Sequence, residues 1–528
     1  MATSKNMARE LTIFFFLCCT VFLPSLAGSD DFLQCLSQTI PSDLVYQQSS
    51  SSFESVLRSS VQNPRYATNT TVRPLCIVVA SGVPHVQAAV RCGRAHGVRL
   101  RVRSGGHDYE GLSYRSVRPE VFAVLDLSRL RAVDVRPAEA AAWVDAGATL
   151  GELYHAVGTA DRRLAFPGGA CPTVGVSGYL SGGGIGLMMR KYGIGADSVV
   201  DARVVNADGD LIGSVASTDQ DLFWAIRGGG GESFGVVVAW RLRLSMVEET
   251  VTVVNIERTL DEGAAALVAK WETLILQPYL PDLTIRVVVQ DHHAFFQTLF
   301  LGRCSRLLRA MRAFFPELGM APADCREMTW LRAMAFIGLG AADAPAEGLL
   351  NRTNNLGTYV KNKSDYVRRA IGRAGWEGIF QQHLSRYGAG LMILEPHGGA
   401  VSAGVLDFAT PYPHRQGVLY NVQYVVFWLD EADGPAAAAA AGWLGGLYGH
   451  MEQFVTSNPR EAFANYRDLE IGENVVGGDG VTTYESGRVW GEKYFMGNFR
   501  RLAAVKGRVD PGDYFRNEQS IPPLLQRF

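Results

Sequence analysis

Hydrophobic and polar residues follow one pattern in the first half of this chain and another in the second. Near the start, two short apolar runs at 76–79 and 98–102 flank a stretch with apolar residues at helical spacing from Pro84. Apolar runs of this length predict strands, and the helical spacing predicts a helix. We therefore expect a β-α-β unit at the beginning of the folded chain.

Further strands and a capped helix are predicted in the first half. The runs 121–125, 142–146 and 236–240 are rich in residues that favour strands. Thr149 and Glu152 have the spacing of a capping box, in which a hydroxyl and a carboxylate bond the first free amides of a helix. These elements indicate an α+β domain suited to a nucleotide.

After residue 246 the pattern changes to longer alternating strands and helices. We predict strands at 251–254, 284–289 and 419–428. Helices are predicted at 305–314, 364–371 and 435–450. The chain is accordingly divided into a first domain, 29–246, a second domain, 247–464, and a segment dense in aromatic and charged residues, 465–528.

Composition and charge narrow the class of protein. With 47% hydrophobic and 19% charged residues among 528, the chain is typical of a compact protein long enough for two domains. A net charge of −2 without Lys/Arg-rich runs argues against nucleic acid as a partner. The triplet Asp291, His292 and His293 has no second ligand cluster at suitable spacing, so we expect no metal site.

The N-terminus, residues 1–28, is interpreted as a secretory signal peptide. Basic residues precede an apolar run at 11–23, and small residues follow it. The alternative, a membrane anchor, needs about 20 apolar residues and a stop-transfer flank. We expect a secreted protein without a membrane span, extracellular or in the cell wall, with the vacuole as an alternative. Sequons place candidate glycans on Asn69, Asn351 and Asn362.

Cysteines add a constraint that depends on this compartment. Two of the eight lie inside the signal peptide, which leaves six in an oxidising environment. We predict a disulfide between Cys35 and Cys92 that ties the N-terminal segment to the first helix. The alternative is that Cys92 is simply a buried helix residue. The pairing of Cys76, Cys304 and Cys325 is left open.

Three glycine-rich loops indicate a long ligand bound against backbone. They occupy residues 103–109, 168–186 and 227–235. Backbone amides free of side chains can point inward and hold a pyrophosphate without a basic patch. Neither a dinucleotide-binding GxGxxG in register with a strand nor a GxxxxGK[ST] phosphate loop is present. Standing alone, the first loop would be read as a tight turn whose His107 bonds locally.

Together, these loops and other motifs resemble the berberine bridge enzyme-like family of plant FAD-linked oxidases. The motifs are RSGGHDYEG, CPTVG followed by SGGGIG, RKYG, DARVVNADG, RGGGGESFGVV, KSDYV, YPHR, NYRDLEIG and RNEQSIPPL. The resemblance runs from Asp31 to Leu524. It implies an α+β fold with a FAD-binding domain of the PCMH or vanillyl-alcohol-oxidase type, made from 29–246 and 465–528. The substrate domain, 247–464, is then an antiparallel sheet flanked by helices.

The resemblance also implies that FAD is held by two covalent bonds. The family's histidine of the GGH motif bonds the flavin 8α carbon and its cysteine before PTVG bonds C6, roles that fall to His107 and Cys171. Such attachment withdraws electron density, fixes the ring and raises the reduction potential. Further cofactor contacts are expected from Arg103, Ser104, Gly105, Gly106, Asp108, Thr173, Gly175, Gly178, Tyr179, Gly182, Gly184 and Asn498.

Catalytic residues are transferred from the family in the same way. Val174, three residues after the linking cysteine, stands at the position that controls oxygen access, and a small residue there resembles oxygen-reactive members. Tyr109, Gln423 and Tyr466 are expected near flavin and substrate, with Asn421 on the same strand face as Gln423. Since an amide cannot act as a base, the proton acceptor is predicted to be a Tyr466 phenolate, which requires a lowered pKa.

Three residues depart from the family pattern and weaken this base assignment. Tyr179 replaces a histidine, Ile185 an aromatic residue and Asn421 a lysine.

Three functions therefore stay open for a protein that we expect to be a monomer and to bind a small molecule. The first is an oxidase that transfers hydride from an alcohol or sugar to flavin N5 and reduces oxygen to hydrogen peroxide. The second is a dehydrogenase or oxidative cyclase, and the third a secreted FAD-carrying binding or storage protein.

Overall fold

The computed structural model describes residues 26–118, 120–277, 280–341, 343–353, 357–385, 388 and 390–525. The predicted signal peptide lies almost wholly outside these residues, and helix α1 (Leu26–Ser37) begins at its end. No helix of the described part is long and apolar enough to cross a membrane.

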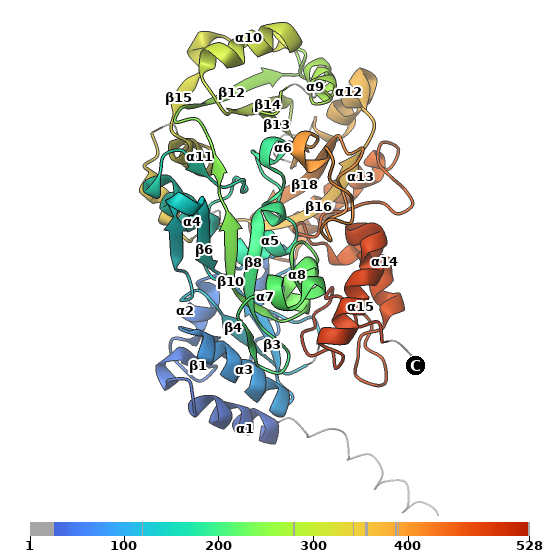
Figure 1. Ribbon diagram of the computed structural model, residues 1–528. Coiled ribbons are helices and arrows are strands. Elements are labelled where there is room, and N and C mark those ends of the chain that lie inside the picture. Colours follow the sequence, from blue (N-terminus) through green and yellow to red (C-terminus); the bar gives the residue numbers. More distant parts are fainter. Residues whose placement is uncertain are drawn as a thin grey trace, which may run out of the picture.

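The first sheet is mixed and lies at the base of the molecule (Figure 1). In spatial order its strands are β1 (Val45–Gln47), β2 (Cys76–Val79), β4 (Phe122–Asp126) and β3 (Arg99–Arg103). The predicted β-α-β unit is present as β2, α3 (Val83–Ala95) and β3, but β4 lies between its strands and is parallel to both. Cys35 and Cys92 form the predicted disulfide, which joins α1 to α3. Helix α2 (Phe53–Arg58) contacts β2.

The second sheet is antiparallel and is adjoined along the chain by the second and third glycine loops, whereas the first loop begins at the end of β3. Its strands, in order, are β5 (Val133–Arg136), β6 (Ala141–Asp145), β10 (Val236–Arg243), β8 (Val199–Val205) and β9 (Leu211–Ile212). A small pair is formed by β7 (Leu164–Ala165) and β11 (Ser245–Met246). The helices of this part are α4 (Leu150–Ala160), α5 (Val176–Ser181), α6 (Met189–Tyr192), α7 (Val215–Thr218) and α8 (Gln220–Ile226). Helix α4 begins at the predicted capping box, where Glu152 N donates to Thr149 Oγ1 at 3.2 Å and Thr149 N to the Glu152 carboxylate at 2.9 Å.

The third sheet has seven antiparallel strands. Their order is β15 (Arg326–Met328), β12 (Val251–Thr259), β14 (His293–Phe300), β13 (Leu283–Gln290), β17 (Leu391–Pro396), β18 (Tyr420–Trp428) and β16 (Tyr359–Val367). Helices α9 (Ala264–Leu274), α12 (Gly372–His383) and α13 (Pro435–Met451) share a hydrophobic core with one face of this sheet. Two further helices, α10 (Cys304–Phe314) and α11 (Trp330–Leu339), follow β14 and β15 along the chain. The opposite face of the sheet is left to line a cavity.

Two sequence predictions on β16 are wrong. Residues 364–371 were expected to form a helix, but Ser364–Val367 pairs with β18 and the helix begins only at Gly372. The predicted glycan on Asn362 is also excluded, because this side chain is 1% exposed and donates to the Arg467 carbonyl. A glycan needs solvent, whereas Asn362 lies in the middle of a sheet. Asn69 and Asn351 are exposed, and their glycans stay predictions.

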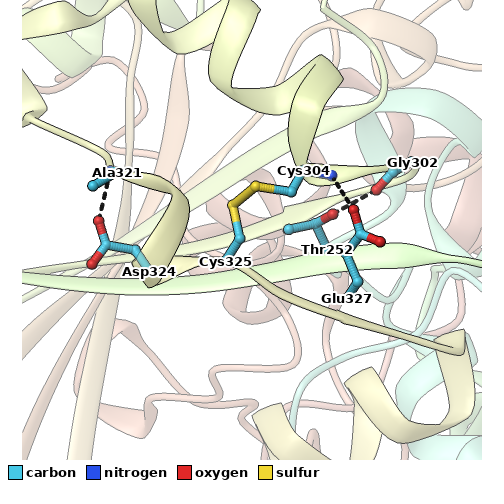
Figure 2. Close-up of a disulfide and its surroundings, with 7 residues drawn as sticks. All are labelled: Thr252, Gly302, Cys304, Ala321, Asp324, Cys325 and Glu327. Carbon is cyan, nitrogen blue, oxygen red and sulfur yellow. Dashed lines mark hydrogen bonds between the residues drawn. A yellow bond between two sulfur atoms is a disulfide. The ribbon is translucent and has the colours of Figure 1, made fainter.

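A second disulfide, which the sequence left open, joins Cys304 to Cys325 (Figure 2). It connects the first residue of α10 to the residue before β15, at the edge of the seven-stranded sheet. Figure 2 shows Glu327 beside it, which accepts from Cys304 N at 2.8 Å. The same view shows Thr252 donating to the Gly302 carbonyl at 2.7 Å. The disulfide and these bonds fix the outermost strand and helix to the sheet.

The C-terminal segment returns to the first part of the chain, beside α7 and α8 (Figure 1). Helices α14 (Tyr484–Phe495) and α15 (Phe499–Val509) contribute to the same hydrophobic core as the second sheet. Lys506, fully buried, donates to the Ser233 carbonyl at 2.7 Å, and Glu518 pairs with Arg101 at 3.1 Å. This packing is in keeping with the predicted joining of 465–528 to the FAD-binding domain. The domain boundaries themselves stay predictions.

Candidate active site

A cavity of about 500 Å³ lies between the glycine loops and the seven-stranded sheet. This volume is within the range of sites that hold cofactors and small molecules. One side, which we call the glycine wall, is made by residues of the loops 104–109 and 169–182. The other, the sheet wall, is made by side chains of β13, β16, β17 and β18, namely Arg286, Val360, Leu391, Ile393, Glu395, Gln423, Val425 and Phe427. Tyr466 and Arg467 line the cavity from the 463–467 loop.

The two loops of the glycine wall meet at Gly105 and Gly175. A Cβ on Gly105 would lie 2.4 Å from the Gly175 nitrogen, and a Cβ on Gly175 would lie 2.5 Å from the Gly105 nitrogen. Ser104 holds the first loop by donating to the Ala146 carbonyl at 2.6 Å. Gly178 differs, because a Cβ there would meet no protein atom within 4 Å. The wall therefore presents bare backbone to the cavity, as the close approach of a long ligand requires.

His107 and Cys171, the two residues expected to bond the flavin, are linked through one hydroxyl. Thr173 Oγ1 lies 2.7 Å from His107 Nε2 and 3.4 Å from Cys171 Sγ. Burial lowers the pKa of His107 to about 4, so the imidazole is neutral at neutral pH. Cys171 is exposed and unpaired, whereas Cys76, also unpaired, is buried, which raises its thiol pKa to about 12. The glycine wall thus presents a neutral imidazole and a free thiol close together.

A hydrogen-bonded chain connects the two walls. Gln423 Nε2 donates to the Tyr109 hydroxyl at 2.9 Å and to Asn362 Oδ1 at 3.3 Å. The Tyr109 ring meets Tyr466 edge to face, with 6.2 Å between centroids. The structure therefore brings Tyr109, Gln423 and Tyr466 together, as predicted, and adds Asn362 to them. Asn362 was considered in the sequence only as a glycan acceptor.

The tyrosines are not poised as phenolates. Burial raises the pKa of Tyr466 well above its usual value, and the negative charge of Glu395 raises it further. Burial also raises the pKa of Tyr109 to about 12, against the opposing effect of the hydrogen bond from Gln423. The protein groups around Tyr466 therefore do not supply the lowered pKa that a phenolate base requires, and its role as the base stays a prediction. Arg286, a cation that lowers the pKa of Tyr466, is outweighed.

An acidic residue of the sheet wall was missed by the sequence reasoning. Glu395 is 6% exposed, and its Oε1 lies 3.4 Å from Arg286 Nη1. Arg286 also donates to Gln297 Oε1 at 2.6 Å. The available signal was that Glu395 follows Leu391 and Ile393 at every second position of the strand. A carboxylate there interrupts an otherwise apolar strand face. That signal does not reveal which residues the neighbouring strands bring beside it.

Three further charged residues of the cavity are ion-paired with one another. Arg467 lies 3.1 Å from Asp108 Oδ2 and 2.8 Å from Glu232 Oε1. These two carboxylates belong to the first and third glycine loops, so Arg467 ties the loops to the 463–467 segment. Asp108 is further held by the Glu110 amide at 2.8 Å.

Most predicted cofactor contacts line the cavity, but several do not. Those that line it are Ser104, Gly105, Gly106, His107, Asp108, Cys171, Gly175, Gly178, Tyr179 and Gly182, together with Val174. Arg103 is wrongly assigned, since its buried guanidinium pairs with Asp126 and with the Leu57 carbonyl at 2.7 Å. Asn498 is also wrongly assigned, because it donates to the Asp407 carbonyl at 2.8 Å.

Asn421 and Gly184 likewise support the site from outside it. Asn421 is fully buried and donates to the Asp365 carbonyl at 3.1 Å. Gly184 lies under the Tyr179 ring, where a Cβ would come within 2.5 Å of a ring carbon. The Tyr179 hydroxyl donates to the Pro167 carbonyl at 3.0 Å and the Gly184 carbonyl at 2.9 Å, so its hydrogen closes the loop and is not left to donate to a ligand. No group of three His, Cys, Asp or Glu that could hold a metal occurs in the described part of the chain.

Comparisons with known proteins agree on the cofactor. Residues 74–213 match the model of a FAD binding domain, and residues 462–522 match that of the "Berberine and berberine like" family. A berberine bridge enzyme-like protein of Cynodon dactylon, Cyn d 4, is 51% identical and covers 94% of this chain and 93% of its own. A tetrahydroberberine oxidase of Berberis wilsoniae is 41% identical, with 98% and 99% covered.

A solved structure gives the same fold. The grass pollen allergen Phl p 4, described as having glucose dehydrogenase activity, superposes with a TM-score of 0.91 at 50% identity. The match covers 94% of this chain and 100% of that one. At such identity and coverage, fold and cofactor class are shared along the chain.

Proposed function

Since this chain belongs to the berberine bridge enzyme-like family of FAD-linked oxidoreductases, we propose that it is a secreted alcohol or sugar oxidase with doubly attached flavin. Substrate carbon would give a hydride to the flavin, and oxygen would take the electrons as hydrogen peroxide. The observation that carries this proposal is the pair His107 and Cys171, held on one Thr173 hydroxyl at the glycine wall.

The residues of the cavity fit the flavin. Thr173 engages His107 Nε2, which leaves Nδ1 as the nitrogen for a bond to the ring. The low pKa of His107 keeps its lone pair available, and Cys171 is exposed rather than consumed in a disulfide. Gly178, with open space where a Cβ would stand, admits the ligand against backbone. Bound there, FAD would supply the hydride acceptor and the route for two electrons to oxygen.

The sheet wall would orient the substrate. Tyr109, Gln423 and Asn362 form one hydrogen-bonded chain, so the Tyr109 hydroxyl, which accepts from Gln423, keeps its own hydrogen for a substrate oxygen. Such a fixed donor selects the hydroxyl end of a substrate and holds its carbon in place. The supporting comparison is Phl p 4, described as a glucose dehydrogenase, and we take D-glucose as the first candidate substrate.

Oxygen as the acceptor is proposed from Val174. This side chain lines the cavity on the glycine wall three residues after Cys171. Wild-type Phl p 4 is described as a glucose dehydrogenase, and a variant with valine in place of an isoleucine as a glucose oxidase. We propose that Val174 fills that position here and leaves room for oxygen at the flavin.

Covalent attachment is tested by the colour of the denatured protein. Acid precipitation of the wild type should leave all flavin in the pellet. Alanine at either His107 or Cys171 should keep one bond and shift the flavin spectrum, and the double variant should release free FAD. Flavin in the supernatant of the precipitated wild type would overturn double attachment.

Oxygen reactivity is tested by reducing the enzyme without air. D-glucose is mixed with the enzyme anaerobically, flavin bleaching is followed, and oxygen is then added. Wild type should reoxidise rapidly with one hydrogen peroxide per turnover, and Val174→Leu should reoxidise at least about tenfold more slowly, equivalent to about 1.4 kcal/mol of barrier. Slow reoxidation of the wild type would make the enzyme a dehydrogenase instead.

A further inference from the structure

Glu395 is a buried carboxylate in the cavity with one oxygen free of any partner. Its Oε1 faces Arg286 Nη1 at 3.4 Å, while Oε2 has no hydrogen bond among the described residues. With 6% of the residue exposed, this oxygen is withdrawn from bulk water. An unsatisfied buried acceptor of this kind needs an explanation, and a ligand hydroxyl supplies one.

The register of the sheet shows what surrounds this oxygen. Glu395 on β17 stands directly opposite Asn421 on β18, and Ile393 stands opposite Gln423, one pair further along. Asn421 Oδ1 is also buried without a hydrogen-bond partner in the described part of the chain. As cross-strand partners, the two residues carry their side chains on the same face of the sheet, with Cβ atoms about 4.5–5.5 Å apart. At that spacing a proton on Glu395 could serve both oxygens.

Charged and titratable groups reach Glu395 from each neighbouring element. Arg286 faces it from β13, Tyr179 from α5 and Tyr466 from the 463–467 loop, since its charge acts on all three. On its own strand, the Glu395 carbonyl is bonded by His397 Nδ1 at 3.1 Å. The carboxylate therefore lies between a cation and two phenols that keep their protons.

The other groups of the cavity cannot take a proton from the substrate. Gln423 has no basic atom, and the two tyrosines keep their protons because burial raises their pKa. Asp108 and Glu232 are both ion-paired with Arg467. His107 is reserved for the flavin under the proposed function.

We propose that Glu395 is the catalytic base, whose carboxylate accepts the hydroxyl proton of the substrate alcohol. The inference rests on the proposed function and replaces the tyrosine assignment. The substrate O–H bond breaks and its proton goes to Glu395 Oε2. The C–H bond breaks and its electron pair leaves with the hydrogen as a hydride to the flavin, and a carbonyl forms. Oxygen then takes up both hydrogens as hydrogen peroxide, which returns Glu395 to the carboxylate.

The electrostatics of the site agree with this role. Burial raises the pKa of Glu395, and Arg286 opposes that rise without cancelling it. A base of raised pKa takes a proton more readily at neutral pH than an ordinary carboxylate. Arg286, held by Gln297, keeps the carboxylate in one orientation.

The first test measures anaerobic flavin reduction by D-glucose between pH 5 and 9. Glu395→Gln should lower the rate about 10²- to 10⁴-fold and abolish the acidic limb of the pH profile. Glu395→Asp, which keeps the carboxylate, should recover part of the rate and the acidic limb. The control is Glu257→Gln on β12, an exposed residue of the same sheet that does not line the cavity, which should behave as wild type.

A second test does not depend on turnover. Because burial raises the folded-state pKa of Glu395 above its unfolded value, its contribution to stability is fully present below the unfolded pKa, near 4.5, and is lost as pH rises through the folded pKa. Glu395→Gln should remove that loss, so its unfolding free energy should fall less than that of wild type above pH 4.5. Identical profiles would overturn the raised pKa on which the base depends.

The outcomes separate the two proposals. If the wild type is not bleached by any sugar or alcohol, the proposed function fails. If the wild type is bleached and Glu395→Gln matches it within about threefold at every pH, the function stands and Glu395 is not the base.

Discussion

The two walls of the cavity are built in opposite ways. The glycine wall is backbone from two contiguous loops, in which Gly105 and Gly175 meet without side chains between them. The sheet wall is side chains, taken at every second residue from strands far apart in sequence, such as Gln423 and Glu395. The glycine wall can be recognised as contiguous motifs in the sequence, whereas the sheet wall forms only once the strands have paired.

The difference separates cofactor binding from substrate chemistry. A flavin can lie against the loops only if their backbone comes close to it, and this demands glycine at particular positions. A substrate is recognised by side chains, and these can vary without disturbing the strands that carry them. We therefore expect changes in the glycine wall to affect cofactor and fold, and changes in the sheet wall to affect rate and pH dependence.

The largest expected effect on the cofactor comes from filling the contact within the glycine wall. Gly175→Ala would place a Cβ 2.4 Å from Ser104 Oγ and 2.5 Å from the Gly105 nitrogen, so the loops must separate. Overpacking of this kind costs about 1–3 kcal/mol or more, and the separation should also abolish covalent flavin. The measurements are chemical denaturation and the ratio of flavin to protein absorbance.

Gly178→Ala is the matched control. Its Cβ meets no protein atom and projects into the space meant for the ligand. Fold stability without flavin should stay within about 0.5 kcal/mol of wild type, while flavin content should fall. If Gly175→Ala and Gly178→Ala lose equal stability, the two positions do not differ in the way proposed, one contacting the other loop and one contacting the ligand.

The glycine wall could be predicted because its chemistry is local. Cys171 lies in a Gly/Pro loop and His107 two residues after Gly105, so motif and site coincide along the chain. The capping box at Thr149 was likewise predicted from a short pattern and is confirmed. The preferred cysteine pairing, Cys35 with Cys92, is confirmed as well.

The sheet wall could not be predicted because its partners are set by register. Nothing in the sequence states that Glu395 pairs with Asn421, or that Arg286 approaches from β13. The helix predicted at 364–371 failed for the same reason, since Ser364–Val367 is held as a strand by β18. Arg103 was misplaced because an arginine beside a glycine loop suggests a phosphate, whereas its partner is Asp126 on the adjacent strand.

The next effect concerns the two disulfides, one in the N-terminal part and one at the edge of the seven-stranded sheet. Cys35 and Cys92 are 57 residues apart in the sequence. Cys304 and Cys325, at the edge of the seven-stranded sheet, are 21 residues apart. Loop-closure entropy predicts losses of about 4 and about 3 kcal/mol when each pair is replaced by alanine. Chemical denaturation should give that order, and a larger loss for the sheet-edge pair would contradict it.

The smallest effect is expected at Tyr466, which lies against the sheet wall without belonging to it. Burial and the charge of Glu395 hold its pKa well above the usual value, so it does not ionise between pH 5 and 9. Tyr466→Phe should therefore slow flavin reduction by less than about tenfold and leave the pH profile in place, because a general base contributes about 10²- to 10⁴-fold. Anaerobic reduction by D-glucose across this pH range measures both quantities. If the rate instead falls by more than a hundredfold and the acidic limb of the pH profile is displaced, Tyr466 of the 463–467 loop is the base, and Glu395 of β17 is not.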